Sequence, residues 1–388
     1  MPSKLEQFTS EVGFPIGCIG ITQNNEVVLG GGGGAGRSGV KNKLAVYTIE
    51  KTGLKSVSEL VLSSSEDAPT SLALHPKEKV LATSINASKA QIEKGENNNC
   101  RLFELKKKSI KAGKSTQSVC STSDYDYQRC SAFDPSGKLL AGGSTNGTLS
   151  VIQYPQLVPA FPFIEASDEI NDVDFNLSGK WLAVTTDKEL KVISAKDGSV
   201  VQTIDNPHTA KGTSAVFRFA KFGRSKGSKE FTALQTRIEL KDVLYTVLNT
   251  RSRKQAYIAM WDTNKWERLV TRPVCNSAIT TFALSKSGRL LAFATASLQI
   301  CICDAHTLRV LMRIHNAHGF AITVLAFDAE EKCLISGSAD ETCQVIVIPD
   351  KWPSATDAVV QFAVANLQAI IVVLVLMLGV LVSLALRN

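Results

Sequence analysis

The segment Ser131-Ala-Phe-Asp-Pro-Ser-Gly-Lys-Leu-Leu-Ala-Gly-Gly143 places a tight turn between two short apolar runs. Four other segments repeat this pattern, namely residues 71–83, 173–184, 281–293 and 325–337. Most are followed by a third apolar run, such as Thr148-Leu-Ser-Val-Ile152. Turns that carry proline, or glycine with its free access to positive φ, separate short strands. The repeat therefore predicts sheets of three strands, each followed by an outer strand.

Two weaker copies of the repeat complete the set. One runs from about Ile16 to Ile49, and the other from about Ala215 to Asp262 with a long basic insertion. The second ends in Trp261-Asp262, the dipeptide typical of WD repeats. Seven units in about 335 residues give the usual length of a propeller blade, with six or eight blades as alternatives. We therefore predict an all-β fold, a seven-bladed WD-repeat β-propeller over residues 1–350.

The C-terminal part of the sequence has a different character. No charged residue occurs from Ala358 to Leu386, and residues 369–386 are nearly all aliphatic. A helix of this length spans the roughly 30 Å hydrocarbon core of a bilayer. We expect a linker at 351–366, a single transmembrane helix at 367–386 and a lumenal tail at 387–388. The basic remainder of the chain is expected to stay in the cytosol, in keeping with the positive-inside tendency.

The chain has 388 residues and a formal net charge of +7. One basic cluster spans residues 106–114 and another spans residues 221–229. Each is either a solvated loop or a surface attracted to an anionic membrane. Nucleic acid is not expected as a partner, because these clusters lack the interleaved aromatic residues of a base-stacking surface. Cys301 and Cys303 should share one strand face as structural thiols, since no second Cys or His pair at zinc-site spacing accompanies them.

The five histidines lie mostly in turns, which argues against a hydrolase. His315 and His318 precede a repeat, where a structural histidine is common in WD repeats, and His75-Pro76 is interpreted as a rigid turn. We identify no general acid or base, no cofactor-binding residue and no small-molecule substrate.

A glycine-rich segment, Leu29-Gly-Gly-Gly-Gly-Gly-Ala-Gly-Arg-Ser-Gly-Val-Lys-Asn-Lys-Leu44, interrupts the first unit. Strand-like residues lie on both sides, so the segment should join two strands of one blade. A nucleotide-phosphate loop is disfavoured, because such loops need a helix to follow. Two interpretations stay open. The segment is either a flexible hairpin loop, or a loop folded back on itself whose carbonyl oxygens converge on a cation.

Residues 31–34 with Ser38-Gly-Val-Lys-Asn42 resemble the signature loop of the endoplasmic-reticulum guanine nucleotide exchange factors that start COPII coat assembly, the prolactin regulatory element-binding protein family. That family has a seven-bladed cytosolic propeller and a C-terminal membrane anchor. The resemblance implies a potassium site of largely backbone carbonyls at Gly31, Gly32, Gly33, Gly34, Ala35 and Asn42. It implies an exchange loop of Ser38, Gly39, Val40, Lys41 and Asn42, with Val40 as the apolar tip.

The function implied by this resemblance is activation of the Sar-type small GTPase at the endoplasmic reticulum membrane. The factor would bind the nucleotide-free GTPase more tightly than the GDP-bound form, so it needs no covalent chemistry of its own. One alternative is an exchange-incompetent adaptor for cargo exit. Another is a generic WD-repeat scaffold with a membrane tail.

Overall fold

The computed structural model describes residues 6–36, 38–205, 214–224, 231–233, 236–238, 242–350 and 352. The propeller is one compact unit that extends over Gln7–Ile348. Within the described part of the chain, no helix is both long and apolar enough to cross a bilayer. The predicted transmembrane helix at 367–386 and the tail at 387–388 lie outside the described residues, as does the linker at 351–366 apart from residue 352.

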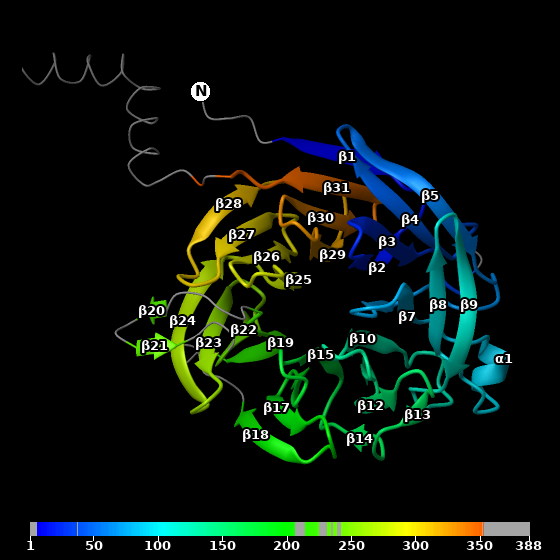
Figure 1. The fold of residues 1–388 in the computed structure, drawn as a ribbon, viewed down its shortest axis with the longest axis horizontal. Helices are drawn as coiled ribbons and strands as arrows, with labels where there is room; N and C mark the ends of the chain where they lie inside the picture. Colours follow the sequence, from blue (N-terminus) through cyan, green and yellow to red (C-terminus); the bar gives the residue numbers. More distant parts are fainter. Residues whose placement is uncertain are drawn as a thin grey trace, which may run out of the picture. The chain divides into compact units, whose positions relative to one another are not determined.

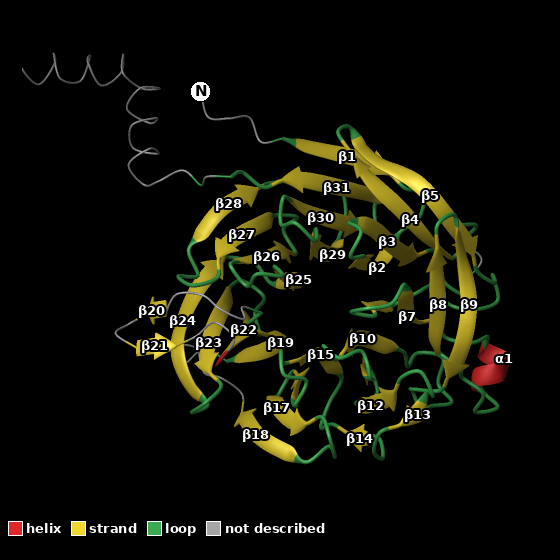
Figure 2. Cartoon of the chain, in the orientation of Figure 1, coloured by secondary structure: helices red, strands yellow, loops and turns green. Residues whose placement is uncertain are grey.

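Seven antiparallel sheets stand around a central axis, which confirms the predicted all-β, seven-bladed propeller (Figure 1). Strands account for nearly all of the regular structure (Figure 2).

The first four blades follow the chain from the centre outward. The first contains β2 (Ile16–Ile21), β3 (Glu26–Gly31), β4 (Lys43–Glu50) and β5 (Gly53–Val61). The second contains β6 (Ser71–Leu74), β7 (Val80–Ser84), β8 (Cys100–Lys106) and β9 (Ser109–Thr116), with the short helix α1 (Lys89–Ile92) after β7. The third contains β10 (Gln128–Phe133), β11 (Leu139–Ser144), β12 (Thr148–Gln153), β13 (Val158–Pro159) and β14 (Ile164–Glu165). The fourth contains β15 (Ile170–Phe175), β16 (Trp181–Thr186), β17 (Glu189–Ser194) and β18 (Val200–Asp205).

The last three blades complete the ring. The fifth contains β19 (Ala215–Phe222), β22 (Val243–Thr250), β23 (Ala256–Asp262) and β24 (Glu267–Cys275), with the hairpin β20 (Phe231–Ala233) and β21 (Thr236–Ile238) inserted after β19. The sixth contains β25 (Ile279–Leu284), β26 (Leu290–Thr295), β27 (Ile300–Asp304) and β28 (Val310–Ile314). The seventh contains β29 (Ile322–Phe327), β30 (Cys333–Ser338), β31 (Thr342–Val347) and β1 (Gln7–Glu11).

The seventh blade departs from the predicted strand order. Its outermost strand does not follow the third one along the chain but comes from the N-terminus, where β1 pairs antiparallel with β31. This pairing closes the ring, so the first and last described strands complete one sheet. The sequence Gln7-Phe-Thr-Ser-Glu11 has only one apolar residue, because β1 is an outer strand with one solvent-facing side.

The repeated turns form as their composition predicts. In the third blade, Asp134 Oδ1 accepts a hydrogen bond from the Leu139 N–H at 2.7 Å, and Asp134 Oδ2 accepts from the Ser136 hydroxyl at 2.6 Å. Gly137 takes the positive φ of 79° that closes the turn. His75 performs a similar task in the second blade, where Nδ1 accepts from the Glu78 N–H at 2.9 Å. Its interpretation as part of a rigid turn is confirmed.

The hydrophobic core lies between neighbouring blades. Cys301 and Cys303 of β27 are buried in one such cluster together with Phe293 and Tyr245, so they share one strand face as predicted. Burial raises the pKa of the Cys301 thiol to about 11. Both side chains therefore behave as small hydrophobic groups.

Candidate functional site

The glycine loop, defined here as residues 32–42, joins β3 to β4 within the first blade. The interpretation that it connects two strands of one blade is confirmed, with Gly31 paired to Lys43 at its base. Because strands alternate in direction, this loop shares a face with the other loops between second and third strands and with the connections between blades. We call this the glycine-loop face.

Backbone crowding makes glycine necessary in this loop. A Cβ atom on Gly33 would lie 1.8 Å from Ser38 Oγ, 2.9 Å from Ser38 Cβ and 3.0 Å from the Val40 carbonyl oxygen, so the opposite arm of the loop would have to shift. A Cβ on Gly32 would lie 2.4 Å from Asn42 Oδ1, and Gly32 has a φ of +143°. These contacts join the two arms of the loop, so the loop is folded back on itself.

Asn42 pins the folded loop from inside. Its side-chain Oδ1 accepts a hydrogen bond from the Gly34 N–H at 2.9 Å, and its Nδ2 donates to the Gly34 carbonyl at 3.1 Å. The same Nδ2 donates to the Glu66 carbonyl at 2.9 Å. Asn42 is 2% exposed, so these bonds are shielded from water. A single amide thus ties both arms of the loop to the connection between the first and second blades.

That connection holds two acidic residues that sequence reasoning missed. Glu66 receives two hydrogen bonds from the Arg101 guanidinium, each of 2.9 Å. Asp67 Oδ1 lies 3.0 Å from the Cβ position of Gly34, so a carboxylate stands beside the loop. No sequence motif marks Glu66 and Asp67, because they reach the glycine loop only when the first and second blades pack together.

The remaining predicted residues differ in exposure. Ala35, Ser38, Gly39 and Lys41 are exposed, so they are the accessible part of the loop. Val40, predicted as the apolar tip, is half-buried and packs against the cluster that contains Phe14.

The oxygen atoms near Gly34 are of the kind that a hard cation takes as ligands. They are its own carbonyl, the Asn42 amide oxygen and the Asp67 carboxylate, although Asn42 Oδ1 also accepts the Gly34 N–H and Asn42 Nδ2 donates to the Gly34 carbonyl. Among the described residues, no group of three or more His, Cys, Asp or Glu side chains could hold a metal ion. A cation bound here would therefore depend mainly on the backbone, as the composition of the loop predicts.

Comparison with known proteins agrees with the propeller fold. Residues 309–346 match the WD domain, G-beta repeat family. SEC12-like protein 2 of Arabidopsis thaliana is 26% identical over 81% of this chain and 74% of its own length. The guanine nucleotide-exchange factor SEC12 of Candida glabrata is 26% identical over 88% of this chain and 72% of its own length. The protein of the same name from Rattus norvegicus is 25% identical, with 87% and 89% covered.

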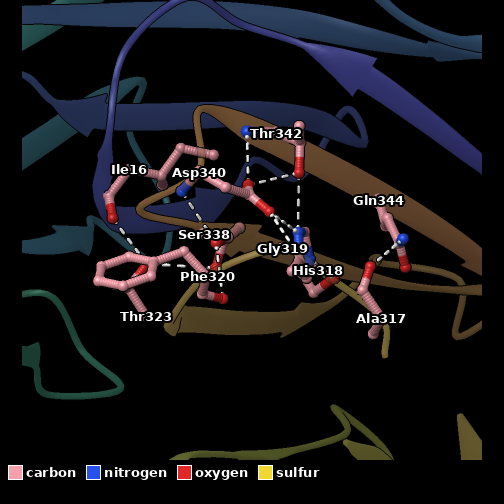
Figure 3. A network of polar contacts seen from close by, with 12 residues as sticks. Ile16, Ala317, His318, Gly319, Phe320, Thr323, Ser338, Asp340, Thr342 and Gln344 are labelled. Atoms are coloured by element: carbon pink, nitrogen blue, oxygen red, sulfur yellow. Dashed lines mark hydrogen bonds and ion pairs between the residues drawn. The ribbon is translucent and has the colours of Figure 1, made fainter. Parts of the chain in front are cut away.

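Over most of its length, the chain is similar to WD-repeat proteins named SEC12. The WD-type match covers β28 of the sixth blade and β29 to β31 of the seventh, where a polar network surrounds His318 (Figure 3). Its Nε2 lies 2.8 Å from Ser336 Oγ, and its Nδ1 lies 2.8 Å from Thr342 Oγ1. Asp340 accepts from the Gly319 N–H at 2.6 Å and from the Thr342 hydroxyl at 2.6 Å.

This network is structural. His318 is 6% exposed, and burial lowers its pKa below the ordinary value of 6.5. The ring therefore stays neutral and joins the connection between β28 and β29 to β30 and β31. The prediction of a structural histidine before the repeat is confirmed for His318, which leaves the glycine loop as the candidate functional site.

Proposed function

We propose that this protein is a guanine nucleotide exchange factor that activates the Sar-type small GTPase at the endoplasmic reticulum membrane and so starts COPII vesicle formation. The observation that carries the proposal is the folded glycine loop, pinned by the buried Asn42 on one face of a rigid propeller. Relatives that match 87–88% of the chain are named guanine nucleotide-exchange factors, which supports the same activity here.

Exchange requires differential affinity. The loop accelerates GDP release only if it binds the nucleotide-free GTPase more tightly than the GDP-bound form. A loop that is already ordered loses little conformational entropy when the GTPase docks, so more of the contact energy goes into distorting the nucleotide site. Ser38, Gly39, Val40 and Lys41 would make the contact, and Asn42 would hold them in place.

Potassium is the cofactor that we propose for the loop. The carbonyl groups of Gly31, Gly32, Gly33, Gly34 and Ala35 and the Asn42 side chain would hold it, with the Asp67 carboxylate nearby as a countercharge. The bound ion would supply a positive centre that offsets the repulsion between converging carbonyl dipoles. Asn42 would orient the loop for this purpose through its bonds to Gly34.

We further propose that the chain is a single-pass membrane protein, on the basis of the apolar segment 367–386. The propeller would remain cytosolic and would confine activation of the GTPase to the membrane surface.

The direct test is GDP release from the Sar-type GTPase, followed by intrinsic tryptophan fluorescence, with and without the propeller in potassium buffer. We expect acceleration that saturates with propeller concentration. Binding to the GTPase without faster GDP release would show that the protein is an adaptor and not an activator. No binding to the GTPase would favour the generic WD-repeat scaffold.

A further inference from the structure

The propeller has a second face, opposite the glycine loop, which we call the turn face. It is formed by the turns that join the first to the second strand and the third to the fourth strand of each blade. Hydrogen bonds link turns of neighbouring blades on this face. Tyr154 donates its hydroxyl proton to Glu78 at 2.6 Å, and Asn25 Nδ2 donates to Asp328 at 3.3 Å. The turns of these neighbouring blades therefore lie side by side on this face.

Exposed cations gather on this face. They come from turns of six of the seven blades, and no ion pair is found for any of them among the described residues. They are Lys51, Lys77, Lys79, Lys107, Lys108, Lys138, Lys180, Lys196, Lys265, Lys286 and Arg309.

Most acidic groups of the turn face are already engaged within the protein. Asp134 and Asp328 are buried and accept bonds from their own turns. Glu331 binds Ser287 and pairs with Arg289 at 3.4 Å. Among the described residues, the exposed carboxylates of the turn face without an ion pair are Glu78, Asp197 and Glu267. The unpaired cations of this face outnumber these carboxylates, so they set the sign of the charge that an approaching surface would meet.

The glycine-loop face has the opposite balance. Its loops carry the acidic residues Glu66, Asp67, Asp124, Asp126, Asp168, Glu169, Asp187, Asp340 and Glu341. Two of its lysines are neutralised, since Lys89 pairs with Asp124 at 3.1 Å and Lys188 with Asp168 at 3.2 Å. Its one basic turn consists of Arg251, Arg253 and Lys254, among the described residues. Acidic groups are thus concentrated on the glycine-loop face of the propeller, and basic groups on the turn face.

The chain leaves the propeller on the turn face. Ile346, near the end of β31, pairs with Gln7, the first residue of β1, and both strand ends lie at this face. The segment predicted to cross a membrane begins at residue 367, so fewer than 20 residues separate it from Ile348. A chain of that length spans at most about 70 Å when fully extended.

We propose that the turn face binds the anionic lipid headgroups of a bilayer. Separate lysines on short turns can each approach a phosphate or carboxylate without displacing any structural ion pair. The exposed aromatic residues Tyr125 and Phe320 both lie on the other face. The aromatic rings of Tyr154, Trp181 and Trp266 at the turn face are only partly exposed, which favours lipid over nucleic acid bases as the partner. Lipid and GTPase then occupy opposite faces, and both can be bound at once.

The test uses the isolated propeller, whose ring is closed by β1 and β31 and whose core clusters all lie within its own residues. Sedimentation with phosphatidylcholine vesicles that contain phosphatidylserine should bring the propeller down, and pure phosphatidylcholine should not. Raised ionic strength should release it, because exposed charges are screened over about one Debye length.

The decisive variant is the triple replacement Lys107→Ala, Lys108→Ala and Lys286→Ala. Each lysine near an anionic surface is worth about fivefold in partitioning, so the triple variant should bind roughly 100-fold more weakly. The matched control, Arg251→Ala, Arg253→Ala and Lys254→Ala, removes the same charge from the glycine-loop face and should bind as the unmodified propeller does.

Three outcomes would overturn the proposal. They are unchanged vesicle binding by the lysine variant, an equal loss in the control, or a propeller that ignores vesicles and binds single-stranded RNA instead. Unchanged melting temperatures of both variants establish that folding is intact. GDP release measured without vesicles should be unaffected by the lysine variant, so this proposal can fail while the exchange function stands.

Discussion

Replacement of Asn42 by alanine separates the order of the glycine loop from the stability of the propeller. The change removes three hydrogen bonds, two to Gly34 and one to the Glu66 carbonyl, of 2.9–3.1 Å. At about 1 kcal/mol each, the folded loop loses about 3 kcal/mol relative to open conformations. The β-ladders on either side do not depend on these bonds, so the loss falls on the loop alone.

A loss of about 3 kcal/mol lowers the fraction of molecules with a folded loop by up to about 100-fold, since every 1.4 kcal/mol is a factor of ten. We expect the rate of GDP release from the Sar-type GTPase at limiting propeller concentration to fall by a similar factor. The measurement is a tryptophan fluorescence time course at several propeller concentrations, with the thermal melting of each variant recorded alongside.

Asn249→Ala is the matched control. Asn249 is also buried, and its amide exchanges hydrogen bonds of 2.9 Å with the backbone of Ile279 between the fifth and sixth blades. This variant should lower the melting temperature and leave exchange per folded molecule unchanged. Exchange by Asn42→Ala within twofold of the unmodified protein would refute the role of the pinned loop.

Four further outcomes follow from the same structure. Replacement of potassium by sodium should slow nucleotide exchange by the unmodified protein and have a smaller effect on Asn42→Ala. Equal effects on both proteins would show that the ion does not act through the loop. Gly33→Ala should abolish exchange, because its Cβ would lie 1.8 Å from Ser38 Oγ, whereas Gly36→Ala meets no atom within 4 Å and should be active. His318→Ala should lower the free energy of unfolding by about 2–3 kcal/mol in urea titration without changing exchange per folded molecule, since it leaves buried hydroxyl groups unpaired. Burial lowers the pKa of His318, so the native state resists protonation of the ring, and stability should decline as the pH falls below 6.5, less so in His318→Ala.

The blades can be predicted from the sequence because each turn is fixed by contacts between residues that are close along the chain. A turn such as Asp134-Pro-Ser-Gly137 fixes its own conformation through bonds that span at most five residues. The outer strand of the third blade is harder to predict, because it consists of two short pieces, β13 and β14, that pair with opposite ends of β12. Prolines lie within and between these pieces, and proline cannot donate a ladder hydrogen bond.

Long-range contacts were beyond the reach of the sequence. The closing strand β1 carries no apolar run, and its partner β31 lies more than 300 residues away. The glycine loop itself stands out by composition, and Asn42 is implied by the resemblance of residues 31–42 to the exchange-factor family. The neighbours that shape the loop, Glu66 and Asp67, reach it only through the assembly of two blades.

Two residues of the second basic cluster, residues 221–229, form ion pairs inside the folded protein. Lys221 pairs with Asp172 at 2.8 Å, and Arg224 pairs with Asp174, so these two residues join the fourth and fifth blades. The two earlier interpretations, a solvated loop or a membrane surface, are wrong for Lys221 and Arg224. The first cluster is different, because Lys107 and Lys108 lie exposed at a turn.

Amide hydrogen exchange in the glycine loop, compared between the free protein and its complex with nucleotide-free GTPase, tests the central claim most directly. In the free protein, the amide hydrogen of Gly34 should exchange slowly with solvent, because it is bonded to Asn42. In the complex, the amide hydrogens of Ser38 to Lys41 should become strongly protected. Protection confined to other loops, with residues 38–41 exchanging as freely as before, would contradict the claim.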